Sequence, residues 1–228
     1  MIHRLKSTVS TMKDAAALAA KGAPHGTAVV AESQSAGIGR HGHAWHSEPD
    51  GGLYLSIVLR LPEPGPSVTM ALGLAVQRAV NDLAGVAADL RWPNDVMLNE
   101  RKLAGILVQA AEGALIAGIG LNINQTWFPT ELSKIATSLF LETGHPHDQE
   151  PILDRLLAES LRHVRLERKD ILRRFEECST YARGKAVEVD GGVRGITAGL
   201  DANGFLKVQT STGVETITAG GVRPVRLS

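Results

Sequence analysis

Residues 32–45 read E-S-Q-S-A-G-I-G-R-H-G-H-A-W and lie between two apolar runs, 27–31 and 53–59. The three glycines let the backbone turn tightly and approach a ligand closely. Exposed N–H groups in such a loop can hold an anion, and Arg40 adds a planar, permanent charge that suits a phosphate. The loop is therefore a candidate phosphate-binding loop, although the pattern alone also fits a mobile, glycine-rich surface hairpin.

Two familiar nucleotide-binding motifs do not describe this loop. The chain has no G-x-x-x-x-G-K-S/T sequence, so it has no Walker A loop. The glycines do show the spacing G-x-G-x-x-G, but residues 43–52 are too rich in turn formers to open the helix of a dinucleotide-binding fold. A phosphate bound here would therefore be held by a different kind of loop.

The composition describes a chain with a proper core and a balanced charge. Its 228 residues are enough for one large domain and one small domain. Hydrophobic residues make up 43%, which supports a folded core and argues against disorder. The 24 basic and 24 acidic residues balance, so the surface as a whole gives no sign of nucleic-acid binding.

The cysteine count and the apolar runs bear on the compartment. Cys178 is the only cysteine, so no disulfide can form within the chain and a reducing compartment is expected. No apolar run approaches the roughly 18 residues of a membrane span. The N-terminus faintly resembles a signal peptide, but Lys13 and Asp14 interrupt its apolar part. We therefore expect a cytoplasmic protein without a membrane span.

Periodicity predicts a mixture of helices and strands up to about residue 180. Helices are expected at 12–22, 67–85, 151–168 and 169–178, and strands at 27–32, 53–59, 96–98, 103–108 and 114–122. Ser10 or Thr11 is expected to cap the first helix, and Ser67 the second. Residues 99–101 read as a hairpin turn, and residues 125–149 as irregular.

The pattern changes from helical to alternating near residues 181–185. Short strands are predicted at 186–189, 195–200, 205–210 and 214–217, with glycine-containing turns between them. This pattern predicts a small SH3-like barrel. Because so small a unit is not very stable alone, we expect it to lean on the rest of the molecule.

A second informative stretch, residues 89–109, reads D-L-R-W-P-N-D-V-M-L-N-E-R-K-L-A-G-I-L-V-Q. The proline stiffens the turn W-P-N-D, whose Asn94 and Asp95 offer side-chain oxygens. Lys102 begins a strand, where a lysine is ordinarily a solvated edge charge. Asn122 ends the later strand G-I-G-L-N, from which it can read an amide or a purine edge, or cap a turn.

Together these motifs resemble those of biotin protein ligases, the enzymes that attach biotin to carboxylases. That family carries a serine–threonine pair, a Q-x-x-G-R-G-R-x-G-R-x-W loop, K-W-P-N-D, R-K-x-x-G-I-L and a strand ending G-x-G-x-N. The matching residues occur in the same order: Ser10-Thr11, Gln34, Gly37 to Arg40, Trp45, Trp92 to Asp95, Arg101-Lys102, Gly105 to Leu107 and Gly120 to Asn122. Each motif alone is weak evidence for the family, but the ordered set is specific, and the similarity spans roughly residues 5 to 225.

The resemblance implies an α+β fold: a mixed, mostly antiparallel sheet with packed helices, as in class II synthetases and biotin ligases, followed by the SH3-like β-barrel. It implies a biotin- and ATP-binding catalytic domain at 1–180 and an SH3-like C-terminal domain at 181–228. The implied enzyme activates biotin as biotinyl-5′-AMP and transfers it to a lysine of the biotin carboxyl carrier protein of acetyl-CoA carboxylase or a related carboxylase. ATP, biotin and Mg²⁺ are the expected ligands, and a homodimer is compatible with the family.

The resemblance also assigns residues to the site. Catalytic roles are expected for Lys102, Arg40 and Asp95: the two cations offset the repulsion between a carboxylate and a polyphosphate, and Asp95 holds Mg²⁺ or orients the acceptor lysine. Biotin contacts are expected from Ser10, Thr11, Gln34, Gly37, Arg40, Lys102 and Gly105. Nucleotide contacts are expected from Gly39, Arg40, His41, Trp45, Asn94, Lys102 and Asn122, with Trp45 stacked on adenine. No residue is assigned to a resident metal.

Five positions depart from the family pattern. Ile38, His41 and His43 stand where many members have arginines, Met12 replaces an asparagine, and Gln109 replaces a glutamate. The loop therefore carries less fixed charge, which bears on how tightly it holds the intermediate. Other members begin with a DNA-binding helix-turn-helix; since Met1 lies nine residues before Ser10, we expect neither that domain nor repressor activity.

The histidines of the loop have a spacing that suits a metal. His41, His43 and His46 lack a cysteine or acidic partner nearby, so no structural metal is expected. We expect His41 and His43 to be partly charged donors near phosphates, with activity that falls as the pH rises past about 7.

Two other functions remain as alternatives. A lipoate or octanoate ligase or transferase resembles the same fold, but it is expected to lack the combination of W-P-N-D with R-K-L-A-G-I-L-V. A non-catalytic biotin sensor would have lost catalysis through its altered loop, and the intact Arg40 and Lys102 argue against it.

Overall fold

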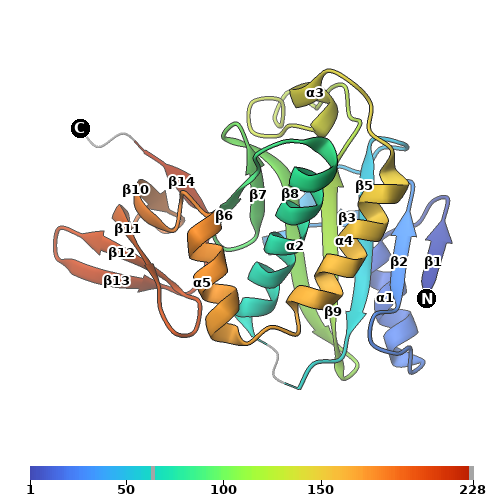
Figure 1. Ribbon diagram of the computed structural model, residues 1–228, viewed down its shortest axis with the longest axis horizontal. Helices are drawn as coiled ribbons and strands as arrows, with labels where there is room; N and C mark the ends of the chain where they lie inside the picture. The colour runs from blue at the N-terminus through green and yellow to red at the C-terminus, as the bar shows by residue number, and fades with distance from the viewer. Residues whose placement is uncertain (63–64, 226–228) are drawn as a thin grey trace.

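A seven-stranded sheet forms the centre of the molecule (Figure 1). The computed structural model describes residues 1–62 and 65–225. The strands follow the order β1 (Ile2–Leu5), β2 (Ala28–Ala31), β5 (Gly52–Leu59), β9 (Ala114–Asn122), β8 (Arg101–Ala111), β7 (Asp95–Leu98) and β6 (Asp89–Arg91). β1 and β2 are parallel, and the other neighbouring pairs are antiparallel. The expected mixed, mostly antiparallel sheet is confirmed.

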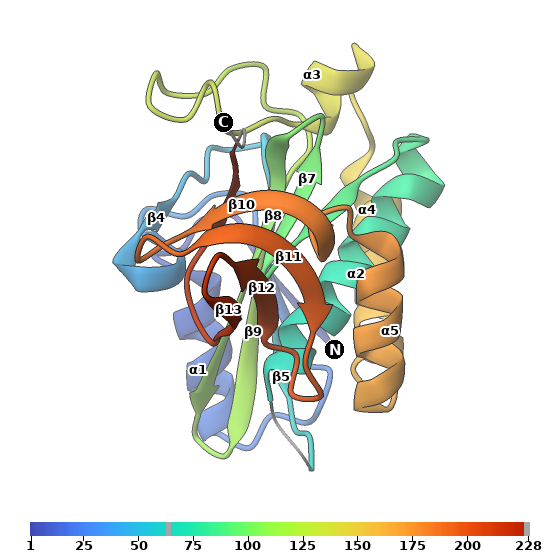
Figure 2. The ribbon, with the colours of Figure 1, turned by 90° about the vertical axis from the view of Figure 1, so that its left-hand side faces the viewer.

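Helices cover both faces of this sheet. α2 (Pro66–Ala84), α4 (Gln149–His163) and α5 (Arg168–Cys178) lie on one face, and α1 (Thr11–Ala20) lies on the other (Figures 1 and 2). Because both faces are covered, β5 is buried over its whole length. Side chains alternate along the strand, so Leu55 and Ile57 lie in the hydrophobic cluster under α2 and Val58 lies in the cluster under α1. Within the described residues, no helix combines the length and the apolar composition that a membrane crossing needs.

The hairpin between β7 and β8 forms as predicted, with a turn one residue shorter than expected. Asn99 and Glu100 make the turn, with φ of 49° and 62°, and Arg101 already belongs to β8. Positive φ at both central residues suits the twist of the flanking strands. The tight turn places Lys102 near the start of β8, opposite Met97 of β7.

The starts of two helices differ from the expected caps. α2 begins at Pro66 after Gly65, so Ser67 lies inside the first turn and is not the cap. Proline suits this first position because an N–H there would have no helical partner. Ser10 does stand at the N-cap of α1, but its side chain makes no capping hydrogen bond. α2 ends as expected, at Gly85 in the left-handed conformation.

Several short elements are missing from the sequence-based prediction: β1, β6, β3 (Gly37–Ile38), β4 (Ala44–Trp45), β14 (Val222–Pro224) and α3 (Leu139–Thr143). α3 lies in the segment expected to be irregular, and the Ser138 hydroxyl caps it by accepting from the Leu141 N–H at 3.1 Å. Elements of two to five residues carry too few repeats for a periodic pattern to be recognised. They form because a neighbouring strand or cap is already in place.

A five-stranded antiparallel sheet follows the helices. Its order is β13 (Gly213–Ile217), β12 (Leu206–Thr210), β11 (Arg194–Leu200), β10 (Arg183–Val189) and β14. Figure 2 shows its strands curling in front of the large sheet. The Trp92 indole N–H donates to the Gly204 carbonyl at 3.0 Å, and Val187 and Leu206 belong to the same hydrophobic cluster as α2. The small sheet therefore packs on the rest of the molecule, as expected.

Candidate active site

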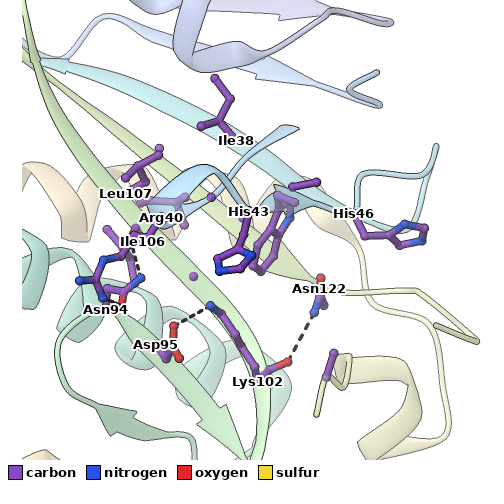
Figure 3. Close-up of a pocket in the computed structure, with 18 of the residues that line it drawn as sticks. Ile38, Arg40, His43, His46, Asn94, Asp95, Lys102, Ile106, Leu107 and Asn122 are labelled. Carbon is purple, nitrogen blue, oxygen red and sulfur yellow. Dashed lines mark hydrogen bonds and ion pairs between the residues drawn. The ribbon is translucent and has the colours of Figure 1, made fainter. Parts of the chain in front are cut away.

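A cavity of about 340 Å³ lies on the face of the large sheet that α1 partly covers. Its floor consists of Gly105 and Leu107 of β8 and Gly118, Gly120 and Asn122 of β9. The register pairs Gly105 with Gly120 and Leu107 with Gly118, so alternation brings all five to one face. The glycine loop and the W-P-N-D turn form its walls, as Figure 3 shows.

The floor glycines hold space that any other residue would close. A Cβ on Gly120 would collide with the Trp45 indole, and a Cβ on Gly105 would lie 2.9 Å from both Trp45 and Lys102 side-chain atoms. At Gly118 it would lie 2.6 Å from the Met12 sulfur. The side chains of Trp45, Lys102 and Met12 therefore approach this part of the sheet more closely than any residue but glycine allows.

The glycine loop is an ordered hairpin. Its strands pair Gly37 with Trp45 and Ile38 with Ala44, and the Gly39 N–H donates to the His43 carbonyl at 2.7 Å. The Arg40 guanidinium at its tip donates to the Asn94 side-chain oxygen at 2.8 Å. It also reaches the Gly220 carbonyl of the small sheet at 3.4 Å. Arg40 thus joins the loop, the W-P-N-D turn and the small sheet.

Lys102 points into the cavity and is not a solvated edge charge (Figure 3). Its ammonium lies 2.6 Å from one carboxylate oxygen of Asp95, whose other oxygen accepts from Arg91 at 2.8 Å. Burial favours the protonated carboxyl, but the two cations outweigh this effect and hold the pKa of Asp95 below its usual value. The Lys102 ammonium also lies 5.5 Å from the centre of the Trp45 ring. The cavity therefore contains fixed cations beside an aromatic face.

Hydrogen-bonding groups gather near the start of α1. Gln34 accepts from the Thr11 N–H at 2.9 Å and donates to the Ser47 hydroxyl at 2.9 Å. The Thr11 hydroxyl lies 2.8 Å from that of Ser56. The Ser10 hydroxyl is buried and has no hydrogen-bond partner among the described residues. This end of the site can offer both donors and acceptors to a small polar ring.

Asn122 holds a third wall in place. Its amide N–H donates to the Thr137 carbonyl at 2.9 Å, and its oxygen accepts from Gln125 at 3.2 Å. These bonds anchor the loop 125–138, which adds Phe128 and Ile135 among other apolar residues to the cavity. In this structure Asn122 therefore positions a wall of the cavity that it also lines.

Most of the residues proposed from the sequence line this one cavity: Thr11, Gln34, Gly39, Arg40, His41, Trp45, Asn94, Asp95, Lys102, Gly105 and Asn122. Ser10 and Gly37 do not line it: Ser10 is buried next to Thr11, and a Cβ on Gly37 would meet the Trp45 carbonyl at 2.6 Å. No cluster of metal-binding side chains occurs in the part of the chain that the structure describes.

Known proteins share both the sequence and the fold. The sequence model of the Biotin/lipoate A/B protein ligase family matches residues 2–126, more than half of the chain. The chain belongs to this family. Among its relatives within the family, the bifunctional ligase/repressor BirA of Bacillus subtilis is 34% identical over 232 residues, which cover 93% of this chain and 70% of the relative. The biotin–(acetyl-CoA-carboxylase) ligase of Mycobacterium tuberculosis is 34% identical over 234 residues, covering 96% and 87%.

Solved structures extend the likeness to the whole fold. The biotin protein ligase from Aquifex aeolicus, solved in complex with biotin and ATP, superposes with a TM-score of 0.89. Its sequence is 30% identical, and the alignment covers 99% of both chains. The small sheet is therefore part of the shared biotin protein ligase fold.

Several residues that line the cavity were not assigned from the sequence. They are Ile38, Tyr54, Arg91, the apolar residues of loop 125–138, and Asp190 and Gly221 of the small sheet. Arg91 precedes W-P-N-D directly, and its position next to that motif was the available signal. Asp190 and Gly221 carry no comparable signal, because only the packing of the small sheet brings them to the cavity.

Proposed function

We infer that the protein is an ATP-dependent biotin protein ligase. The observation that carries this function is one cavity that combines a glycine-floored slot with the Lys102–Asp95–Arg91 cluster and Arg40. The relatives point the same way, since one is named as a biotin–(acetyl-CoA-carboxylase) ligase and another was solved with biotin and ATP.

The first step joins biotin to AMP. A carboxylate oxygen of biotin attacks the α-phosphorus of ATP, the new O–P bond forms, and the bond to pyrophosphate breaks. The two reactants carry like charges, so Lys102, Arg40 and Arg91 stabilise the transition state by offsetting their repulsion. Asp95 is a suitable single carboxylate for a Mg²⁺ that arrives with the nucleotide, and such an ion would neutralise phosphate charge.

We place the biotin ring system beside Met12 and Trp45, the side chains that cover the floor glycines. Thr11 and Gln34, which line the cavity, face its ureido group with the buried Ser10 next to them, while Leu107 and Ile38 contact the apolar chain. The nucleotide then lies toward the loop tip, with its adenine against Trp45. This arrangement brings the biotin carboxylate toward Lys102 and Arg40.

We place further nucleotide contacts along the loop and the turn, in line with the resemblance: Gly39, His41, Asn94 and Asn122. Gly37 and Gly105 provide backbone close to biotin. Because both oxygens of Asp95 are engaged by cations, Asp95 first of all orients Lys102; holding Mg²⁺ and orienting the acceptor lysine both remain roles that it can take when ligands arrive.

The second step transfers biotin to a protein. The ε-amine of a lysine attacks the acyl carbon of biotinyl-AMP, a C–N bond forms, and AMP leaves with the electrons of the broken C–O bond. We propose the biotin carboxyl carrier protein of acetyl-CoA carboxylase or a related carboxylase as the acceptor, in a cytoplasmic setting that suits a single cysteine. A homodimer and the absence of a DNA partner stay predictions.

Exchange of labelled pyrophosphate into ATP tests the function directly. Biotin, lipoate and octanoate are supplied in turn, with and without Mg²⁺. Exchange that requires biotin and Mg²⁺ is expected. Exchange with lipoate or octanoate instead would assign the protein to that branch of the family, and biotin binding without any exchange would leave a biotin sensor.

A further inference from the structure

A second cavity, of about 180 Å³, adjoins the active site. Four residues line both cavities: Arg40, Asn94, Ile106 and Leu107. These residues therefore form the partition between the two spaces. Figure 3 labels all four, and they lie on the same side of the close-up.

Within this partition, Arg40 comes from the glycine loop and rests on the hydrogen-bonded pair Asn94 and Ile106. The Asn94 amide donates to the Ile106 carbonyl at 3.0 Å, and the Ile106 N–H donates to the Asn94 carbonyl at 2.9 Å. The Arg40 guanidinium donates to the Asn94 side-chain oxygen of this pair at 2.8 Å. Arg40 is thus the one part of the partition that belongs to the loop, so its side chain can move without a movement of the sheet.

The walls of the second cavity combine apolar and polar groups. Met70, Val108 and Phe205 contribute hydrocarbon, Thr69 and Thr218 contribute hydroxyl groups, and Arg40 is the one charged side chain among the described residues that line it. A lysine side chain has a four-carbon stem that fits such walls and an amine at its end.

The charge of the partition also suits an amine nucleophile. Arg40 disfavours a second cation, so it favours the neutral amine, which is the form that attacks an acyl group. A polyphosphate fits this space less well, since the main cavity gathers Arg40, Arg91 and Lys102 and the second cavity has Arg40 alone.

We propose that the second cavity is the passage through which the acceptor lysine reaches biotinyl-AMP, an inference that rests on the ligase function proposed above. Arg40 keeps the intermediate in the main cavity and yields to the arriving side chain. The lysine nitrogen then bonds to the acyl carbon, AMP leaves with the electron pair of the C–O bond, and the amine proton passes to solvent.

Two variants that narrow the passage test this proposal, and neither residue belongs to the proposed catalytic or binding machinery. Val108→Trp fills it from β8, and Thr218→Trp fills it from an exposed position on the small sheet. The matched control is Val214→Trp, at a position that is 56% exposed on β13 and does not line either cavity.

Three reactions are measured for each protein. Biotin-dependent pyrophosphate exchange reports the first step, transfer from purified biotinyl-AMP to an apo carrier domain reports the second, and hydroxylamine cleavage of bound biotinyl-AMP reports attack by a nucleophile too small to need the passage. In both filled variants, transfer to the carrier is expected to slow on the order of tenfold or more, as for other misplaced reactants. Exchange and hydroxylamine cleavage are expected to stay within about twofold of wild type.

Other outcomes overturn the proposal in distinct ways. Wild-type transfer rates in both filled variants would place the route of the lysine elsewhere. Exchange that slows in step with transfer would assign the cavity to the polyphosphate of ATP. A wild-type protein that forms no biotinyl-AMP would instead contradict the ligase function, and the passage with it.

Discussion

Asp95 shares its carboxylate between two cations, and this arrangement organises the cavity at the scale of single residues. Lys102 and Arg91 each contact a different oxygen, so the ammonium is held in one place before any ligand arrives. An incoming phosphate can replace Asp95 as the partner of Lys102 at little cost in reorganisation. Such preorganised charge is usually a large contribution to catalysis.

Lys102→Ala is expected to slow adenylation by about 10²–10³, or roughly 3–4 kcal/mol, the cost of removing one well-placed charge-stabilising group. Biotin-dependent pyrophosphate exchange measures this rate. Lys169→Ala, at a side chain that is 78% exposed on α5, is the control and should exchange like wild type. Near-wild-type exchange in Lys102→Ala would remove this residue from the mechanism.

At the scale of elements, β8 and β9 form the floor because their glycines coincide in register. Gly105 faces Gly120 across the pair, and Gly118 faces Leu107. The same glycines would weaken an ordinary strand, since they contribute no side chain to packing. Here Trp45 and Met12 supply the missing contacts from the loop and from α1.

Gly120→Ala is expected to push the Trp45 indole off the floor. Overpacking of this kind costs about 1–3 kcal/mol of stability, and biotin affinity should fall because the slot narrows. Titration calorimetry and thermal unfolding measure the two effects. Gly73→Ala, inside α2, is the control. Its new methyl group would lie 3.6 Å from the Leu90 side chain, an ordinary contact. Replacing a glycine within a helix by alanine stabilises the helix by about 0.5–1 kcal/mol. Unchanged biotin affinity in Gly120→Ala would argue against the floor as the biotin site.

α4 carries a buried histidine that links stability to pH. Burial lowers the pKa of His163, and the positive charges of Arg162 and Arg174 lower it further. Glu159 opposes this shift through its charge and through its carbonyl oxygen, which lies 2.9 Å from Nδ1 of the histidine. The unfolded chain therefore takes up this proton first as the pH falls below about 6.5. The stabilisation is complete above that value and is lost as the pH falls toward the lower pKa of the folded state.

His163→Gln is expected to reduce the fall in melting temperature between pH 7.5 and 5.5. The change of melting temperature with pH should become smaller without disappearing, because burial also lowers the pKa values of His25 and His147. Melting curves across this range measure it. An identical slope in wild type and variant would show that His163 does not titrate differently on unfolding.

At the scale of the whole molecule, the active site depends on the contact between the two sheets. Trp92, directly before the proline of W-P-N-D, donates across this contact to Gly204, and Arg40 reaches Gly220. Met70 of α2 also lies close to this glycine, since a Cβ on Gly204 would be 3.2 Å from its side chain. The small sheet therefore supports both the turn and the tip of the loop.

Trp92→Phe removes the indole donor and leaves the buried Gly204 carbonyl without it. A loss of about 1–3 kcal/mol in the free energy of unfolding is expected, measured by urea denaturation. Hydrogen exchange in residues 183–224 should rise at the same time. Trp127→Phe, at an indole that is 55% exposed, is the control and should change stability by less than about 0.5 kcal/mol. Unchanged hydrogen exchange in the small sheet would contradict the dependence of that sheet's stability on Trp92.

The sequence by itself determined the parts of this protein that rest on local chemistry. Apolar runs bounded by turn residues predicted β5, β8 and β9, and Gly85 marked the end of α2. The loop 32–45 and the W-P-N-D turn were recognisable because glycine and proline restrict a backbone wherever they occur. Eleven of the residues proposed for the site do line the cavity, because their motifs lie at the ends of these strands and turns.

Only the tertiary structure decided how these parts meet. Nothing in the local sequence says that Arg91 shares Asp95 with Lys102, that Asn122 ties down the loop 125–138, or that Asp190 reaches the cavity. Ser67 looked like a cap, but Gly65 and Pro66 start α2 instead. The physical reason is that strand register and packing decide which side chains meet. Arg91, Asp95 and Lys102 converge through the pairing of β7 with its two neighbours, and Arg40 reaches Gly220 across 180 positions of the chain.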